Sequence, residues 1–337
     1  LLMSAARLLS LGTLPMLFLG RLGNLLCFVG LTWLAMRRLP FGNEVLFGVA
    51  LLPMTLHLSA SYSYDGMIMG CFFLFAAVCL DLAYQKEQVT WKDILLLAVL
   101  IAVAGPCKMV YAVLMGLCLL IPVGKFGGWR RWFLAAAVVA FAWAAAMVLV
   151  NRQVVASYVE ETEAYVMWAG EPGFTLTLLL HQPLVLIRMF YQTFLWQTES
   201  YHLTMIGSSL GGLDPVLDVP YPLVVAFSLS LLGLTLRKPG ENLAISRGQR
   251  LWILIVCAGC AAAILGSMLI AWTPVSSKVI NGVQGRYFLP FLPVLLMAVK
   301  NDTVVLTKNP NRSILYVMCC MDGYVLLRLY SIISMRV

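Results

Sequence analysis

Long apolar runs separated by short polar loops dominate the chain from residue 13 onward. A helix needs about 20 apolar residues to cross a bilayer, and runs near that length recur along the sequence. The pattern therefore predicts an all-α transmembrane bundle of about ten spans. From the apolar boundaries, the spans are expected at 13–36, 41–59, 65–84, 92–105, 107–123, 132–150, 219–236, 251–272, 286–299 and 313–333.

The fourth and fifth runs are short for a bilayer, and Gly105-Pro106 stands between them. Proline and glycine interrupt helices. We therefore expect two half-depth or tilted helices around a break inside the membrane, which is tolerated where it faces protein or water.

Basic residues collect in alternate loops, which is the signature of loops on the cytoplasmic side. Fourteen of the 23 basic residues lie in five such loops: Arg37, Arg38, Lys86, Lys92, Lys125, Arg130, Arg131, Arg237, Lys238, Arg247, Arg250, Lys300, Lys308 and Arg312. The opposite loops are acidic: Glu160, Glu161, Glu163, Glu171, Glu199, Asp214 and Asp218. The pattern predicts that both ends of the chain lie outside.

One long segment, 151–218, separates two spans and is predicted to lie outside. Within it, residues 173–197 mix large apolar and aromatic side chains with polar ones, which indicates one or two amphipathic helices in the outer interface. The Gly- and Pro-rich stretch 207–222 predicts a turn. The chain thus divides into an N-terminal transmembrane region of about six spans (residues 1–150), this outer loop, and a C-terminal transmembrane region of about four spans (residues 219–337).

Composition agrees with this class, because 61% of the residues are hydrophobic and only 11% are charged. Soluble domains carry about 25% charged residues. The net charge of +8 is explained by the basic loops, so no nucleic-acid partner is expected. The nine cysteines lie in or beside apolar runs, which argues against a disulfide framework. The three histidines show no ligand spacing, so no metal site is predicted.

Charged residues at outer helix ends are the candidates for chemistry, since charges at membrane depth are costly. Asp65 ends a polar turn of Ser and Tyr residues that includes Tyr64. It is either a helix N-cap or a catalytic carboxylate facing a site. Lys108 follows the Gly105-Pro106 break, with Tyr111 one turn on, and either snorkels to the interface or binds a phosphate.

The segment 284–287 (QGRY) carries a further candidate. The planar fork of Arg286 suits a phosphate, whereas an interfacial anchor formed with Tyr287 is the alternative. Gly285 would permit close approach of the backbone to a ligand. Arg21, several residues into the first span, is an interface anchor or a partner for an acid such as Asp65.

Two charged residues of the last predicted span, Asp322 and Arg328, are six positions apart and do not share a helix face. We interpret them as structural.

Four segments resemble, in order, the motifs of the bacterial membrane-protein family called domain of unknown function 2142. Pro53 with 59–65 looks like its "P…as.s.D" signature, and 108–111 looks like its "K..Y" element. The segment 207–214 resembles "G..G.ld", and 282–290 is similar to "GvQGRYflP", the most specific of the four. Together they cover residues from about 15 to 300 of the sequence.

This resemblance implies a place among the GT-C glycosyltransferases, polytopic enzymes that take sugars from polyprenyl-phosphate carriers at the outer face of the membrane. It implies a sugar donor of that kind, a glycan or lipid acceptor of the cell envelope, and location in the bacterial cytoplasmic membrane. Lys108 and Arg286 would hold the carrier phosphate as leaving group. The substrate-binding set would be Arg21, Tyr64, Lys108, Tyr111, Gln284, Arg286 and Tyr287. No cofactor is indicated, and a divalent cation stays open.

The sequence departs from the family at one place. Such enzymes usually carry an acidic first outer loop, roughly "PPDE..H", and nothing like it precedes Arg21. The sequence starts at Leu1 without Met, so we expect a fragment, an inactive relative, or an enzyme that uses another carboxylate, of which Asp65 is the best substitute. A flippase or transporter of a lipid-linked anion, which would also use broken helices, and a non-catalytic scaffold are the rival functions.

Overall fold

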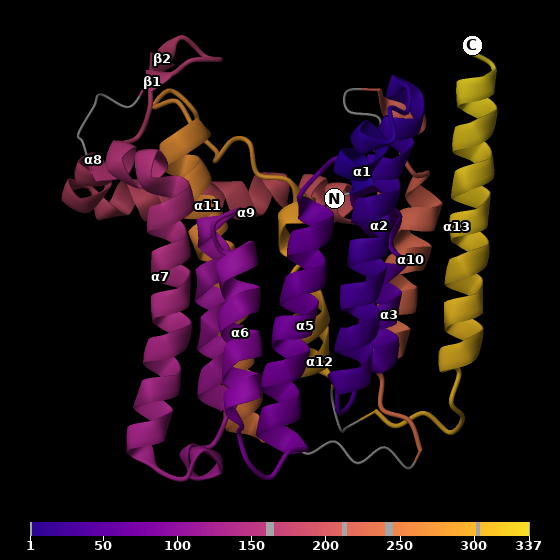
Figure 1. Cartoon of the computed structure of the whole chain (residues 1–337). Helices are drawn as coiled ribbons and strands as arrows, with labels where there is room; N and C mark the ends of the chain where they lie inside the picture. The colour runs from indigo at the N-terminus through magenta and orange to yellow at the C-terminus, as the bar shows by residue number, and fades with distance from the viewer. Residues whose placement is uncertain (1, 160–164, 211–213, 240–244, 301–303, 337) are drawn as a thin grey trace.

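The computed structural model describes residues 2–159, 165–210, 214–239, 245–300 and 304–336. Long helices stand side by side and form a bundle (Figure 1). The described strands form one short antiparallel pair, β1 (Tyr165–Val166) with β2 (Glu171–Pro172). The predicted all-α helical bundle is therefore confirmed.

Within the described residues, five helices are long and apolar enough to cross a membrane. They are α2 (Thr13–Arg38), α5 (Asp65–Tyr84), the stretch Trp129–Gln153 of α7 (Trp129–Val159), α11 (Arg247–Trp272) and α13 (Asn311–Ser334). Two shorter apolar helices join them, η1 (Met109–Leu120) and α10 (Tyr221–Thr235). The remaining helical segments are α1 (Leu2–Leu8), α3 (Asn43–Ala50), α4 (Pro53–Ser59), α6 (Trp91–Ala104), η2 (Val123–Phe126), α8 (Leu176–His181), α9 (Pro183–Ile206), η3 (Pro215–Leu217), η4 (Gly285–Phe288) and α12 (Leu292–Val299).

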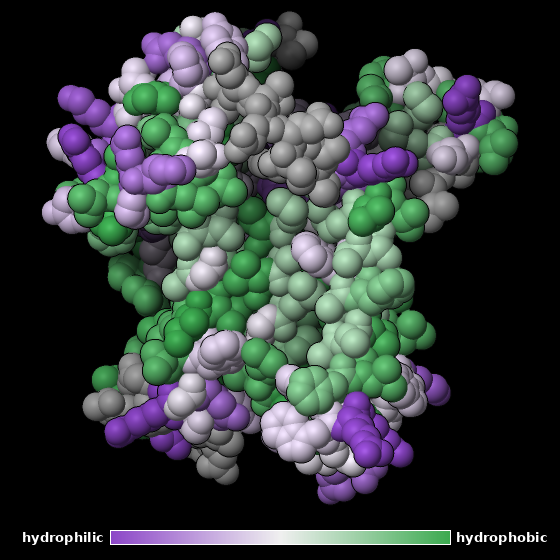
Figure 2. All heavy atoms as spheres, turned by 90° about the vertical axis from the view of Figure 1, so that its left-hand side faces the viewer, coloured by the Kyte–Doolittle hydropathy of each residue, from purple (hydrophilic) through white to green (hydrophobic). Residues whose placement is uncertain are grey.

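Helix α5 forms the centre of the bundle. Nearly all of its side chains are buried, and it packs against α2, α4, α6 and η1. A helix that is apolar on every side belongs in the interior of a bundle. On the outside of the molecule, an apolar band separates two polar ends on the face that Figure 2 shows. Such a band is the surface that hydrocarbon chains solvate.

Two segments that the sequence predicts as single continuous helices are interrupted in the structure. The segment 41–59 forms α3 and α4, and Leu52 between them has an extended backbone. The cause is Pro53, because proline excludes the helical conformation from the residue before it and suits the first position of a new helix. The segment 286–299 likewise forms a short 3₁₀ turn, η4, followed by α12.

The predicted break at Gly105-Pro106 is confirmed, since α6 ends at Ala104 and the next helix begins at Met109. That next helix is η1, a 3₁₀ helix of 12 residues rather than an α-helix. Runs of 3₁₀ helix longer than about four residues are uncommon. An apolar run alone does not distinguish the two helix types.

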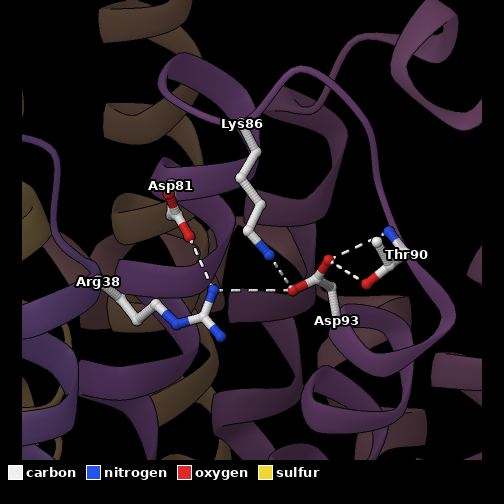
Figure 3. A network of polar contacts seen from close by, with 5 residues as sticks. All are labelled: Arg38, Asp81, Lys86, Thr90 and Asp93. Carbon is white, nitrogen blue, oxygen red and sulfur yellow. Dashed lines mark hydrogen bonds and ion pairs between the residues drawn. The ribbon is translucent and has the colours of Figure 1, made fainter.

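A network of charged side chains joins the ends of α2, α5 and α6 (Figure 3). Arg38 donates to Asp81 at 3.0 Å and lies 3.8 Å from Asp93, which also pairs with Lys86 at 2.6 Å. Asp93 and Thr90 form a capping box at the start of α6. The attraction between these opposite charges offsets the free-energy cost of removing each of them from water. This is the end of the bundle that the basic loops predict to be cytoplasmic.

The amphipathic segment predicted at 173–197 forms α8 and α9, and α9 continues to Ile206. These helices run across the upper end of the bundle in Figure 1. Several large apolar side chains of α9, including Leu184 and Trp196, are exposed. Glu160, Glu161 and Glu163 of the predicted acidic loop, and Gly211 and Leu213 of the predicted outer motif, lie outside the described residues.

Candidate functional site

Three segments that lie far apart in the sequence meet at one end of the bundle. They are the turn that leads into α5, the break between α6 and η1, and η4. The Lys108 ammonium lies 2.6 Å from the Asp65 carboxylate and 4.1 Å from the centre of the Tyr287 ring. It also lies 5.6 Å from the centre of the Tyr64 ring. Four of the residues singled out in the sequence are thus neighbours.

Asp65 is the first residue of α5, and its carboxylate points to side chains rather than to the helix backbone. It accepts hydrogen bonds from Lys108 and, at 2.9 Å, from the Ser63 hydroxyl. The Ser63 hydroxyl in turn accepts from the Asp65 N–H at 3.1 Å. This geometry does not fit an N-cap, and the alternative of a carboxylate that faces a site stays a prediction.

The turn that carries Asp65 is fixed by Asn24 of α2. The side-chain amide of Asn24 donates to the backbone carbonyls of Ser61 and Ser63, each at 2.9 Å. A half-buried amide that satisfies otherwise unpaired carbonyls stabilises a non-helical segment. Asn24 therefore sets where α5 begins.

We call Lys108 with its neighbours Asp65, Tyr64 and Tyr287 the Lys108 cluster. A cavity of about 350 Å³ lies beside it, and all of its members except Asp65 contribute to the cavity wall. Asn151 lines it too, at a point where α7 departs from helical geometry. The Asn151 amide donates to the carbonyl of Pro106 at 2.5 Å, so the kink in α7 holds the break that precedes Lys108. Sequence reasoning missed Asn151. The available signal was the polar run Asn151-Arg152-Gln153, which interrupts an apolar helix.

Arg286 lies next to the cluster without a counter-ion. Its guanidinium is 5.7 Å from the Tyr287 ring, and its buried Nε has no hydrogen-bond partner. Within the described ranges no acidic side chain forms an ion pair with it. The charge of Arg286 acts on both Lys108 and His57. A guanidinium without an acidic partner beside a second cation is an arrangement that attracts oxyanions.

Gly285 allows η4 to lie directly on α9. Its N–H donates to the Thr204 hydroxyl at 2.8 Å, and a Cβ atom at this position would lie 1.7 Å from the Tyr201 carbonyl oxygen. The predicted close approach is therefore real, but its partner in the structure is the backbone of α9 rather than a ligand. Glycine is required because any side chain would push η4 and Arg286 away.

Two other residues of the predicted substrate-binding set hold η4 in place. Tyr111 is 1% exposed, and its hydroxyl donates to the carbonyl of Tyr287 at 2.8 Å. The carbonyl of Gln284 accepts from the N–H of Tyr287 at 3.0 Å and opens the 3₁₀ turn. Both therefore position the residues that flank Arg286.

Arg21 stands apart from the Asp65–Lys108 pair. Its guanidinium lies 5.7 Å from the Tyr62 ring, and none of the ion pairs in the described structure joins it to Asp65. Of the two alternatives for Arg21, the partnership with Asp65 is not formed among the described ion pairs, in which Asp65 pairs with Lys108. Arg21 instead lines a second cavity together with His57.

Tyr64 lies in the turn before α5. Burial raises the pKa of its phenol above the ordinary value, the negative charge of Asp65 raises it further, and Arg286 lowers it. The net effect is upward, so the phenol stays protonated at neutral pH and is able to donate a hydrogen bond. Tyr64 therefore supplies a neutral donor beside two cations.

The histidines have separate surroundings. His181 contacts the carbonyl of Thr177 at 2.8 Å, and His202 contacts the Ser228 hydroxyl at 2.7 Å. In the ranges that the structure describes, no three His, Cys, Asp or Glu side chains are grouped so as to hold a metal ion. Lys108 and Arg286 are the cations of this end of the bundle, and their charge suits an anion better than a metal ion.

Residues 1–295 match the family described as "Predicted membrane protein (DUF2142)". The chain belongs to this family. The resemblance drawn from the sequence motifs is thereby confirmed. The matched range contains the turn before α5, the break before η1, and η4, so the DUF2142 segment carries the whole cluster, whereas α13 lies beyond it. No curated protein and no solved structure matches this chain.

Proposed function

We propose that this DUF2142 protein is a GT-C-type glycosyltransferase that takes a sugar from a polyprenyl-phosphate carrier at the outer membrane face. The acceptor is a glycan or lipid of the bacterial cell envelope. The observation that carries the proposal is Arg286, a guanidinium without an acidic partner that lies beside Lys108 and the lined cavity. Such a site needs an anion for its charge to be balanced.

The charges of the cluster suit a phosphate that becomes a leaving group. Lys108 and Arg286 contribute two positive charges and Asp65 one negative charge, which leaves +1. When the bond between sugar and phosphate breaks, the carrier phosphate gains negative charge. Cations that are already in place stabilise that charge more than they stabilise the bound donor.

Asp65 is the carboxylate available as base. In this role it takes the proton of the acceptor hydroxyl while the new bond from sugar to acceptor oxygen forms and the bond from sugar to phosphate breaks. Its carboxylate accepts a hydrogen bond from the Lys108 ammonium at 2.6 Å. The same pair makes Asp65 the residue that positions Lys108.

The membrane arrangement in this proposal is a GT-C-like bundle of about ten crossings, in which the short helices α3–α4, α6, η1 and α12 complete the spans. Asp65 begins α5, whereas Asp81 and the charged network of Figure 3 lie at its other end. The cluster and the basic loops are thus at opposite ends of the bundle. Helix α9, with its exposed apolar side chains, then lies at the outer interface and guides the carrier lipid.

The test is a transfer assay with polyprenyl-phosphate sugars and the full chain in vesicles. Arg286→Ala and Lys108→Ala are each expected to lower transfer by at least about 100-fold, the loss typical for removal of one charge-stabilising group. Arg312→Ala, an exposed arginine at the opposite end, is the matched control and should leave transfer unchanged. Full activity in both site variants would overturn the phosphate-binding role.

A second candidate function is a flippase for a lipid-linked anion. The observation in its favour is that helices are broken at two places, inside the predicted span 41–59, between α3 and α4, and between the predicted spans 92–105 and 107–123, which form α6 and η1. Transporters use paired broken helices to form their binding sites. Movement of the lipid-linked anion across the vesicle membrane without a new glycosidic bond would identify this function.

A further inference from the structure

A second cavity of about 440 Å³ lies between α2, α4 and α13. Its polar wall consists of Arg21, His57, Ser61 and Asp322, and the rest is almost entirely apolar. None of the Lys108 cavity's lining residues takes part in it. Because α13 lies beyond the matched DUF2142 range, one wall of this cavity is outside the segment that carries the Lys108 cluster.

Asp322 is the unusual member of this wall. It is 7% exposed, lies in the middle of α13, and its Oδ2 atom is buried without a hydrogen-bond partner. A buried carboxylate oxygen that accepts no hydrogen bond destabilises the folded protein, and the cost is larger when the group is charged. The described residues provide no partner for this atom, so a ligand with a donor group would supply one.

The positive side of the cavity is supplied by Arg21, with His57 beside it. Arg21 and Asp322 line the same space, yet among the described ion pairs none joins them. The positive charge in the wall of this cavity is therefore that of Arg21. Opposite charges held apart across one cavity complement a ligand that carries both signs.

The apolar wall of the cavity indicates what the rest of the ligand is. Leu25 and Leu56 lie in the cavity, and Leu326 of the same wall is 65% exposed on the outside of the bundle. The wall therefore continues from the charged groups to the surface that faces hydrocarbon. A free polar metabolite would leave this apolar surface uncovered, whereas lipid chains cover it.

We infer that this cavity binds a zwitterionic phospholipid whose head group carries a primary ammonium and a phosphodiester. The ammonium donates to Asp322, the phosphodiester accepts from Arg21, and the acyl chains lie along the apolar wall. A primary ammonium is required because a quaternary one has no N–H to donate to the carboxylate. This inference concerns a site separate from the Lys108 cluster and does not rest on the proposed glycosyl transfer.

The test is lipid binding to the full chain, measured by native mass spectrometry in detergent. The probes are phosphatidylethanolamine, phosphatidylcholine and phosphatidylglycerol with identical acyl chains. Phosphatidylethanolamine is expected to bind at least about 10-fold more tightly than phosphatidylcholine, which corresponds to about 1.4 kcal/mol. Equal binding of the three lipids would overturn the inference.

Variants assign the two contacts. Asp322→Asn should abolish the preference for phosphatidylethanolamine over phosphatidylcholine, and Arg21→Gln should weaken binding of all three lipids. Arg312→Gln, an exposed change at the far end of α13, is the matched control. Gel filtration verifies that each variant is folded, and a preference that survives in folded Asp322→Asn would also overturn the inference. O-phosphoethanolamine without acyl chains should not compete, and competition by it would identify a soluble ligand instead.

Discussion

The ammonium of Lys108 donates to the carboxylate of Asp65 across 2.6 Å, and the two side chains are only 19% and 14% exposed. The pair joins positions 43 residues apart in the chain. It fixes the break before η1 against the start of α5. An ion pair this far from water is costly to disrupt, because each charge would be left without its partner.

The first prediction concerns this pair. Lys108→Ala is expected to lower the free energy of unfolding in detergent by about 3–5 kcal/mol, since it leaves the Asp65 carboxylate buried and unpaired. The double variant Asp65→Asn with Lys108→Ala should recover some of this loss. Thermal and denaturant unfolding measure both, and a double-mutant cycle with no coupling would contradict the pairing.

A second prediction follows from the contact between η4 and α9. Gly285→Ala is expected to lower the unfolding temperature and to weaken anion binding at Arg286, because its Cβ atom would overlap the Tyr201 carbonyl. Gly266→Ala in α11 is the control, since a Cβ atom there meets nothing within 4 Å. Equal behaviour of the two alanine variants would show that η4 does not depend on this close approach.

The network at the opposite end gives a third prediction. Asp93→Ala removes a capping box and two ionic contacts at once, so the unfolding free energy should fall by about 2 kcal/mol. Lys92→Ala changes the exposed neighbour in the same turn and should have little effect. Unfolding of the two variants under identical detergent conditions makes the comparison.

The fourth prediction concerns pH and the outer segment. A hydrogen bond from Arg336 lowers the pKa of Asp214, and the N–H of Val216 adds to this effect. The folded protein therefore holds this carboxyl ionised at a pH where the unfolded chain, with a pKa of about 4, becomes protonated. The stabilisation is complete above pH 4 and disappears as the pH falls through the lowered pKa.

In measurement, the unfolding temperature of the unaltered protein should fall more steeply below pH 4 than that of Asp214→Asn. Arg336→Gln should show the same reduced slope, because it removes the other half of the pair. The difference should shrink in high salt, since the pair is at the surface. A slope unchanged in both variants would show that the pair does not form in solution.

The sequence predicted the helical bundle well because length and apolarity decide which helices cross a bilayer. It located α5 and α13 within a few residues. It did not predict the interruption at Pro53, since the apolar pattern continues through that proline. It also missed the 3₁₀ form of η1, because a run that is apolar on every face carries no periodicity that separates helix types.

For the site, the sequence identified the residues better than their partners. Asp65, Lys108 and Tyr287 do meet, but the ion pair between positions 43 apart depends on how α5 packs against the break before η1. A partnership with Asp65 was one of two alternatives for Arg21, and the turn before α5 places the Tyr62 ring beside Arg21. The sequence assigned no role to His57 or Asn151, and only the folded arrangement shows which cavities they line.

The 3₁₀ geometry of η1 has a mechanical consequence. A 3₁₀ helix rises about 2.0 Å per residue, so its 12 residues extend about 24 Å, whereas an α-helix of the same length would extend about 18 Å. A short apolar segment thereby reaches across most of a hydrocarbon layer about 30 Å thick. Rewinding η1 into an α-helix would shorten it by about 6 Å and draw Lys108, at its upper end, into the bilayer. The length of this one helix thus sets the depth at which the lysine stands.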